Sequence, residues 1–228
     1  INPEYLDKNF SQIFVFWDKL FGTFQAEMKE VPPVYGILRS ANTWNPIIIN
    51  FKHLWQLIKD AWYAQRIIDK IIIWFMPTGW RPSDVAEKYP LQIIKSPYDQ
   101  EKYHTENSFQ LLAWSWIQLS LSSLFMFYLF IIMENFTSQM IFTYVIFIML
   151  HVFGYTSTLD GRRYAIITET LKLGVGLILL TKLDLNLYGS ENIVVLGLIL
   201  YLFTSLGLTY YFLTGKHKHQ QVLSKINL

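Results

Sequence analysis

The chain has 228 residues and no cysteine, which excludes disulfide bonds, thiolate metal sites and a cysteine nucleophile. Hydrophobic residues make up 52% of the sequence and charged residues only 16%, against about 25% in a typical soluble domain, so the composition indicates a membrane protein. The formal net charge of +2 is too small for the basic stripe of a nucleic-acid binder. We therefore expect the membrane as a partner and no nucleic acid.

The opening segment, Asp7 to Phe24, is rich in aromatic residues and has an amphipathic pattern. Its apolar residues recur at helical spacing, while its polar residues lie mainly on the other side. This pattern predicts an amphipathic helix that rests at a membrane interface. The apolar side consists of Phe10, Ile13, Phe14, Trp17, Phe21 and Phe24.

A second amphipathic pattern covers Ile47 to Tyr63 and predicts another helix. The apolar stretch from Arg66 to Met76 is too short to cross a bilayer, so we expect it to be interfacial or buried. Residues 31–106 should therefore form a cytoplasmic or interfacial helical segment. The apolar side of the second pattern includes Leu54, Trp55, Ile58 and Trp62.

Four later segments are apolar and long enough to be membrane spans, since a bilayer core of about 30 Å needs roughly 20 residues. The third contains Glu169 and Lys172, which lie three residues apart and can pair on one helix face. Ionisable groups in a span usually face protein or water, so we interpret this couple as internally paired, with a proton or substrate contact as the alternative. The segments are Leu111–Met133, Met140–Tyr155, Tyr164–Leu183 and Ile193–Leu213.

Basic residues lie mainly on one side of these four spans. One group separates the second and third spans and another follows the fourth, whereas the opposite loops carry a single lysine. By the positive-inside rule, the N-terminal segment and the tail are cytoplasmic. The sequence thus predicts an all-α integral membrane protein of the endoplasmic reticulum in a eukaryote, or of the cytoplasmic membrane in a bacterium. The basic residues are Arg162 and Arg163, then Lys216, Lys218 and Lys225, with Lys182 on the opposite side.

The histidines do not form the closely spaced clusters that metal sites use, so we predict no metal site within this chain. His217 and His219 lie in the basic tail and should be solvated. We interpret His151, inside a span, as hydrogen-bonded to a neighbouring helix. For His53, on the second amphipathic helix, a place near an active site and a packed interface are both open. No nucleophilic serine motif or phosphate-binding loop is present, so the residues alone show no catalytic machinery.

The stretch INPEYLDKNFSQIFVFWDKLFGTF at the start of the chain is nevertheless specific. It resembles the segment that follows the last histidine cluster in the fatty acid hydroxylase (sterol desaturase) superfamily. Further patches resemble the alkylglycerol monooxygenase branch of that superfamily. They are Ala26-Glu27, Val34–Gly36, Asn42–Trp44 with Pro46, Phe51–Leu54, Pro77–Trp80 and the element LDGRRYAIITETLK from Leu159 to Lys172.

This resemblance implies a membrane-bound oxygenase with a diiron site that is held by histidine clusters, and in this branch with tetrahydrobiopterin as reductant. The ligand histidines would lie upstream of Ile1, which is not a methionine, so we expect the chain to be a C-terminal fragment that is inactive alone. The lipid substrate would be an alkylglycerol ether. The alternatives are a sterol or fatty acid hydroxylase or desaturase of the same superfamily, and a non-catalytic membrane scaffold.

The resemblance also implies roles for residues of the opening motif and for His53. Four polar residues would orient the metal-binding histidines through hydrogen bonds; for Asp7 and Asp18 the alternative is that they only cap and pair within helices. Four further residues would shape the substrate channel. The polar residues are Asn2, Asp7, Asn9 and Asp18, and the channel residues are Trp17, Phe21, Phe24 and His53. The expected divisions are residues 1–30 as the end of the catalytic domain, 31–106 as the helical segment, 107–214 as the transmembrane region and 215–228 as the tail.

Overall fold

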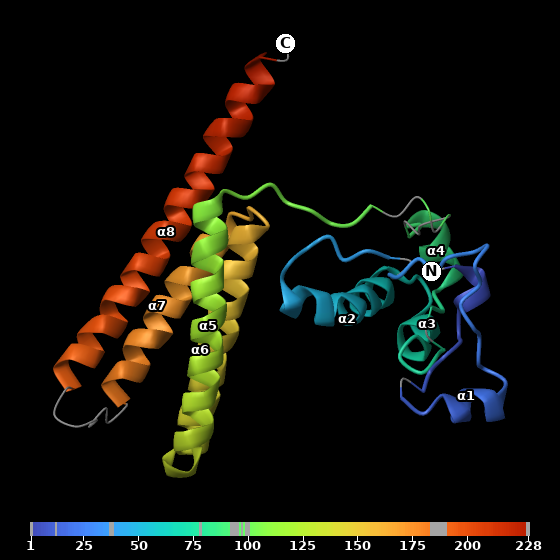
Figure 1. Cartoon of the computed structure of the whole chain (residues 1–228), viewed down its shortest axis with the longest axis horizontal. Coiled ribbons are helices and arrows are strands. Elements are labelled where there is room, and N and C mark those ends of the chain that lie inside the picture. The colour runs from blue at the N-terminus through green and yellow to red at the C-terminus, as the bar shows by residue number, and fades with distance from the viewer. Residues whose placement is uncertain are drawn as a thin grey trace. The chain divides into compact units, whose positions relative to one another are not determined.

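The structure is a computed structural model of the chain that describes residues 2–11, 13–36, 39–77, 79–91, 96, 98, 101–182 and 191–226, with only the backbone for 191, 192 and 216–226. The described residues form helices and no strand, which confirms the predicted all-α fold (Figure 1). In chain order these are η1 Pro3–Tyr5, α1 Val15–Phe21, α2 Pro46–Tyr63, α3 Ile67–Ile72, α4 Ser83–Lys88, α5 Phe109–Ile132, η3 Met133–Asn135, α6 Ser138–Leu159, α7 Tyr164–Lys182 and α8 Glu191–Ile226.

The chain divides into two compact units. The first comprises Ile1–Asn42 and Lys52–His104, and the second comprises Thr43–Phe51 and Thr105–Leu228. Helix α2 therefore begins in the second unit and ends in the first.

In the first unit, the opening amphipathic helix is shorter than its aromatic spacing predicts, because α1 covers only Val15–Phe21. The chain before it folds back onto the helix. The backbone amides of Phe10 and Ser11 donate to the carboxylate of Asp18, at 2.9 and 3.0 Å. Asn9, just upstream, has a φ of 54°, which is not a helical value. The apolar spacing alone carries no information about this fold-back.

The short helices of the first unit expose large apolar side chains. On α1, Trp17 is 44% and Phe21 is 73% exposed. Trp55 and Trp62 on α2 are exposed as well. An interfacial helix places such a face among lipid head groups and acyl chains. The interfacial location itself stays a prediction.

Helix α2 closely matches the helix predicted from Ile47 to Tyr63. Its first residue is Pro46, whose missing N–H costs nothing at a helix start. Asn45 caps the helix, since its side-chain oxygen accepts from the amides of Ile47 and Ile48 at 3.0 and 3.2 Å.

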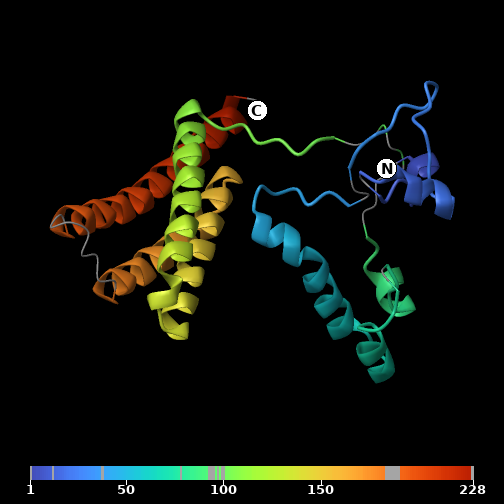
Figure 2. The same cartoon turned by 60° about the horizontal axis from the view of Figure 1, so that its bottom comes forward.

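The second unit contains the four predicted spans. The described helices long and apolar enough to cross a membrane are Phe109–Asn135, Ser138–Leu159, Tyr164–Lys182 and Ile193–Gly215, which confirms all four segments. Helix α5 packs on α6, α6 on α7 and α7 on α8, with a smaller contact between α6 and α8 (Figure 2). The buried core consists of Leu129, Tyr144, Phe147, Leu179 and Leu202.

Candidate functional site

The polar residues of the opening motif hold a loop together. The side-chain oxygen of Asn2 accepts from the amide of Val34 at 2.7 Å. The hydroxyl of Tyr5 accepts from the amide of Met28 at 2.8 Å and donates to the carbonyl of Val31 at 2.7 Å. Residues at the start of the chain are thereby tied to the segment that follows α1.

A second tie involves Asn9 and the residues that end the motif. The amide of Asn9 donates to the carbonyl of Thr23 at 2.9 Å. Its side chain donates to the carbonyl of Gln25 at 2.8 Å and accepts from the amide of Gln25 at 3.0 Å. The side-chain amide of Asn9 thus pairs with the backbone of Gln25 through two hydrogen bonds, as a backbone amide would.

Asp18 is the centre of the fold-back. Its carboxylate accepts from the amides of Phe10 and Ser11 and, at 2.8 Å, from the hydroxyl of Thr23. Burial acts to raise the pKa of the Asp18 carboxyl, but the hydrogen bonds from Thr23, Ser11 and Phe10 outweigh it and hold the pKa below its usual value. Asp18 is thus an ionised acceptor that organises backbone.

The hydrogen bonds given above for Asn2, Asn9 and Asp18 are made to the opening segment and to the segment that follows α1. Their proposed hydrogen bonds to metal-binding histidines stay a prediction. Asp7 is exposed and has a φ of 54°.

Of the predicted channel residues, the structure brings Trp17 and Phe21 together, with stacked rings 6.1 Å apart. The Lys19 ammonium lies 5.2 Å from the ring centroid of Phe24. His53 lies on α2 with an exposed side chain. All four are accessible from outside the first unit taken by itself, and their role in a channel stays a prediction.

An ion pair that the sequence pattern did not indicate also holds the first unit. The guanidinium of Arg81 donates to both carboxylate oxygens of Asp60, at 2.6 and 2.8 Å. Burial acts to raise the pKa of Asp60, but the hydrogen bonds from Arg81 and Gln56 bring it below its usual value. The aspartate lies on α2 and the arginine directly precedes Pro82, so the pair ties α2 to the turn before α4.

In the second unit, two patches of the family resemblance meet. The hydroxyl of Thr43 and the amide of Trp44 donate to the carboxylate of Asp160, the latter at 2.9 Å. The side-chain N–H of Asn45 donates to Ser157 Oγ at 2.9 Å. The Asn42–Trp44 element is thus joined to the end of α6, more than a hundred residues away in sequence.

A charged pair lies at the centre of the second unit. Lys172 Nζ is 2.6 Å from Glu169 Oε2, and both side chains have an exposed fraction of 0%. Ser205, on α8, donates to Glu169 Oε2 at 2.6 Å and accepts from Lys172 Nζ at 2.7 Å. The internal pairing predicted from the i, i+3 spacing is confirmed, and the structure adds a third member from another helix.

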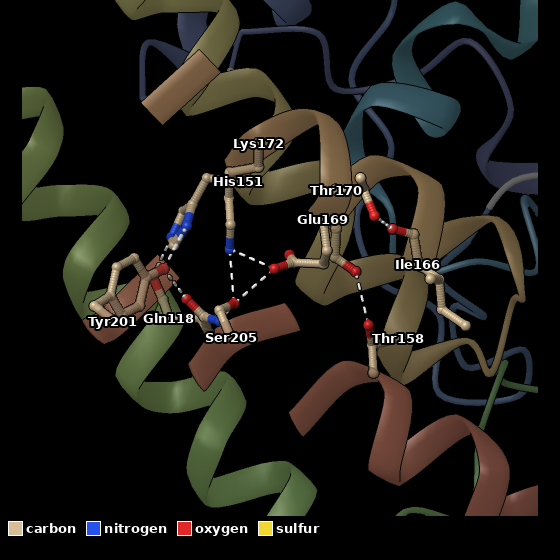
Figure 3. A network of polar contacts seen from close by, with 10 residues as sticks. Gln118, His151, Thr158, Ile166, Glu169, Thr170, Lys172, Tyr201 and Ser205 are labelled. Atoms are coloured by element: carbon tan, nitrogen blue, oxygen red, sulfur yellow. Dashed lines mark hydrogen bonds and ion pairs between the residues drawn. The ribbon is translucent and has the colours of Figure 1, made fainter. Parts of the chain in front are cut away.

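The network continues to α5 and α6 (Figure 3). Gln118 donates its side-chain N–H to Ser205 Oγ at 2.8 Å and accepts from the hydroxyl of Tyr201 at 2.5 Å. His151 lies with Nδ1 2.9 Å from the Tyr201 hydroxyl and Nε2 2.9 Å from the carbonyl of Gln118. The predicted hydrogen bond between His151 and a neighbouring helix is therefore confirmed, and the network links all four helices.

Within this buried network, the second carboxylate oxygen of Glu169, Oε1, has no hydrogen-bond partner. This oxygen lies against Gly154 of α6, where an added Cβ would come within 2.2 Å of it. Glycine is therefore the residue that lets the carboxylate of α7 approach the backbone of α6 so closely.

Three members of the network, Gln118, Tyr201 and Ser205, were missed by sequence reasoning. Of these, only Gln118 could have been identified from the sequence, because a side-chain amide inside a span is costly unless it bonds to another helix. Tyr201 and Ser205 are common in spans, so nothing in the sequence singles them out.

The described residues contain no group of three or more histidine, aspartate or glutamate side chains that could hold a metal ion. The network offers one imidazole and one carboxylate, and both already have hydrogen-bond partners within it. The described side chains therefore do not fit a diiron centre.

Curated proteins with related sequences come from several animals. The chain is 29% identical over 167 residues to the alkylglycerol monooxygenase of Homo sapiens, which covers 73% of this chain and 37% of that protein. It is 34% identical over 90 residues to the alkylglycerol monooxygenase of Caenorhabditis elegans, covering 36% of this chain and 18% of the relative. For the enzyme of Danio rerio the identity is 32% over 107 residues, covering 43% and 23%.

The chain is related to alkylglycerol monooxygenases. This relationship confirms the predicted resemblance to these proteins, whereas the wider superfamily stays a prediction. The chain spans well under half the length of each of these relatives. No family model and no solved structure matches it.

Proposed function

We propose that this chain is the C-terminal, membrane-embedded part of a lipid monooxygenase that cleaves alkylglycerol ethers by hydroxylation. The observation that carries the proposal is the similarity to a protein named alkylglycerol monooxygenase along 73% of the chain. Four helices able to span a membrane support it, because an ether lipid is held in the same bilayer.

In this proposal the diiron centre and its histidine ligands belong to a part of the protein outside this chain, and tetrahydrobiopterin is the reductant. When bound, the iron centre would supply the oxidation chemistry, and this chain would supply no ligand.

The chain's own contribution would be a rigid wall and a lipid-facing anchor. The loop built by Asn2, Asn9 and Asp18 would directly follow the last histidine cluster, so its internal hydrogen bonds would limit the movement of that cluster. Trp17 and Phe21 would offer apolar surface to the entering lipid.

Membranes that contain the complete protein test this proposal. They are incubated with an alkylglycerol, oxygen and tetrahydrobiopterin, and the fatty aldehyde released from the ether is measured. Membranes that contain only the 228-residue chain serve as the control. We expect aldehyde from the complete protein, only with the pterin, and none from the chain alone.

The same membranes are then offered a sterol and a free fatty acid. Hydroxylation or desaturation of one of these without aldehyde release would favour the alternative enzyme of the superfamily. A complete protein that binds no iron and converts none of the lipids would contradict the proposal and favour a membrane scaffold.

A further inference from the structure

The second unit contains a cavity of about 250 Å³ among its four helices. All four long helices line it, and its lining residues are aliphatic or aromatic, with one glycine. Gly176 forms part of the wall, and an added Cβ there would lie 2.8 Å from Leu202. The cavity is partly open rather than sealed. Residues that line it include Phe125, Tyr144, Leu179, Leu198 and Tyr201.

Tyr201 separates this cavity from the buried charged pair. Its hydroxyl is taken up by Gln118 and His151, so the side that lines the cavity is the aromatic ring. Lys172 Nζ lies 5.3 Å from the centroid of the same ring. Apart from Glu169 Oε1, which lies against Gly154, the polar side chains of the network bond to one another, so the wall that Tyr201 adds to the cavity is apolar.

Enclosed apolar cavities stay dry and take apolar guests; one of about 150 Å³ binds benzene. This cavity has the same kind of apolar lining but is partly open, so a guest can enter it from the surface of the helices. The helices that form this cavity are long and apolar enough to lie in a bilayer, where the abundant apolar guest is the hydrocarbon chain of a lipid. An empty cavity would leave its lining atoms without partners and would cost stability.

We propose that this cavity binds one hydrocarbon chain of a membrane lipid. Binding requires no metal and no turnover, so the proposal is independent of the oxygenase activity proposed above. Ether lipids and ester lipids both carry such a hydrocarbon chain, and the test separates the two sources.

The test uses an alkylglycerol with a photoreactive diazirine in the middle of its chain, and the ester-linked acylglycerol with the same chain. Each probe is added to the purified chain in nanodiscs, irradiated, and the labelled peptides are identified by mass spectrometry. Leu198→Trp fills the cavity, whereas Leu200→Trp, at an exposed position of the same helix, is the matched control. We expect saturable labelling of cavity residues in the wild type and in the control, and loss of that labelling in Leu198→Trp.

Labelling by both probes would assign the cavity to lipid chains in general, and labelling by the ether probe alone would assign it to alkyl lipids. Labelling that cannot be competed by unlabelled lipid, or that is equal in the two tryptophan variants, would overturn the proposal. If Leu198→Trp fails to fold, Val194→Phe narrows the same cavity from the same helix and is compared with Ile193→Phe, whose position is exposed.

Discussion

At the scale of single residues, one aspartate decides the path of the opening segment. The carboxylate of Asp18 gathers two backbone amides and a hydroxyl, so the chain turns back where aromatic spacing alone would continue a helix. A short side chain with several acceptor sites can override the apolar pattern in this way, because it offers nearby backbone amides hydrogen bonds that compete with those of a helix.

Replacement of Asp18 by asparagine should loosen this fold-back. Because the pKa of Asp18 is lower in the folded chain, its ionised form contributes stability that is fully present above the usual value of 3.8 and is lost as the pH falls below it. Hydrogen exchange at the amides of Phe10 and Ser11 should therefore accelerate in Asp18→Asn at neutral pH, and in the wild type only on acidification.

Asp7→Asn is the matched control, because Asp7 is an exposed aspartate. Its backbone is left-handed, a conformation that asparagine also adopts, so the change itself should cause no strain. Equal exchange rates in the two variants would contradict the role given to the Asp18 carboxylate.

The close approach of Glu169 to Gly154 should make this glycine sensitive to substitution. In Gly154→Ala the new methyl group would meet Glu169 Oε1 and push the carboxylate away from its partners. We expect a loss of about 1–3 kcal/mol, the usual cost of overpacking. Gly174→Ala is the control on α7, because an added Cβ there meets nothing within 4 Å. Thermal unfolding of both variants in detergent measures the difference, and an equally stable Gly154→Ala would contradict the close approach.

At the scale of helices, periodicity and length predicted α2 and all four spans, because these helices are long and their apolar residues dominate the signal. The same reasoning overestimated α1. A helix of seven residues is defined by its ends, and those ends depend on Asp18 and on Gly22, whose φ is 71°. Such contacts join residues at spacings that no periodic pattern contains.

At the start of α2, one residue both caps the helix and joins it to α6. Asn45 caps the helix and also bonds to Ser157, so Asn45→Ala removes a cap worth about 1 kcal/mol together with a buried hydrogen bond. We expect faster hydrogen exchange in the first turn of α2 and at the end of α6. Asn50→Ala is the control on the same helix: its exposed side chain bonds only to the carbonyl of Pro46 within α2, so this change should leave the end of α6 unaltered. Fraying of α2 with an unchanged α6 would contradict the link to Ser157.

At the scale of the whole molecule, the sequence indicated the membrane class and the relationship to alkylglycerol monooxygenases, but only part of the buried network. The couple of Glu169 and Lys172 was visible because charges are rare in spans. The contacts with Gln118, Tyr201 and Ser205 depend on how four helices pack, and nothing in the separate segments gives that packing.

The predicted orientation in the membrane can be tested directly, since the chain has no cysteine of its own. Single cysteines replace Arg162, between α6 and α7, and Asn135, at the opposite loop. We expect a membrane-impermeant maleimide to label Arg162→Cys only from the cytoplasmic side and Asn135→Cys only from the other, as the basic residues require. The reversed result would place the N-terminal segment and the tail outside the cytoplasm.

The division of α2 between the two units limits how this protein can be rearranged by evolution. The bundle does not begin at Thr105, because Thr43–Phe51 belong to it and Thr43, Trp44 and Asn45 bond to α6. A recombination event at a single point in the gene cannot transfer this bundle whole without carrying Lys52–His104 along. Lys52–His104 should therefore be inherited with the bundle, and a lineage that shortens this segment must still keep Thr43–Phe51 connected to Thr105.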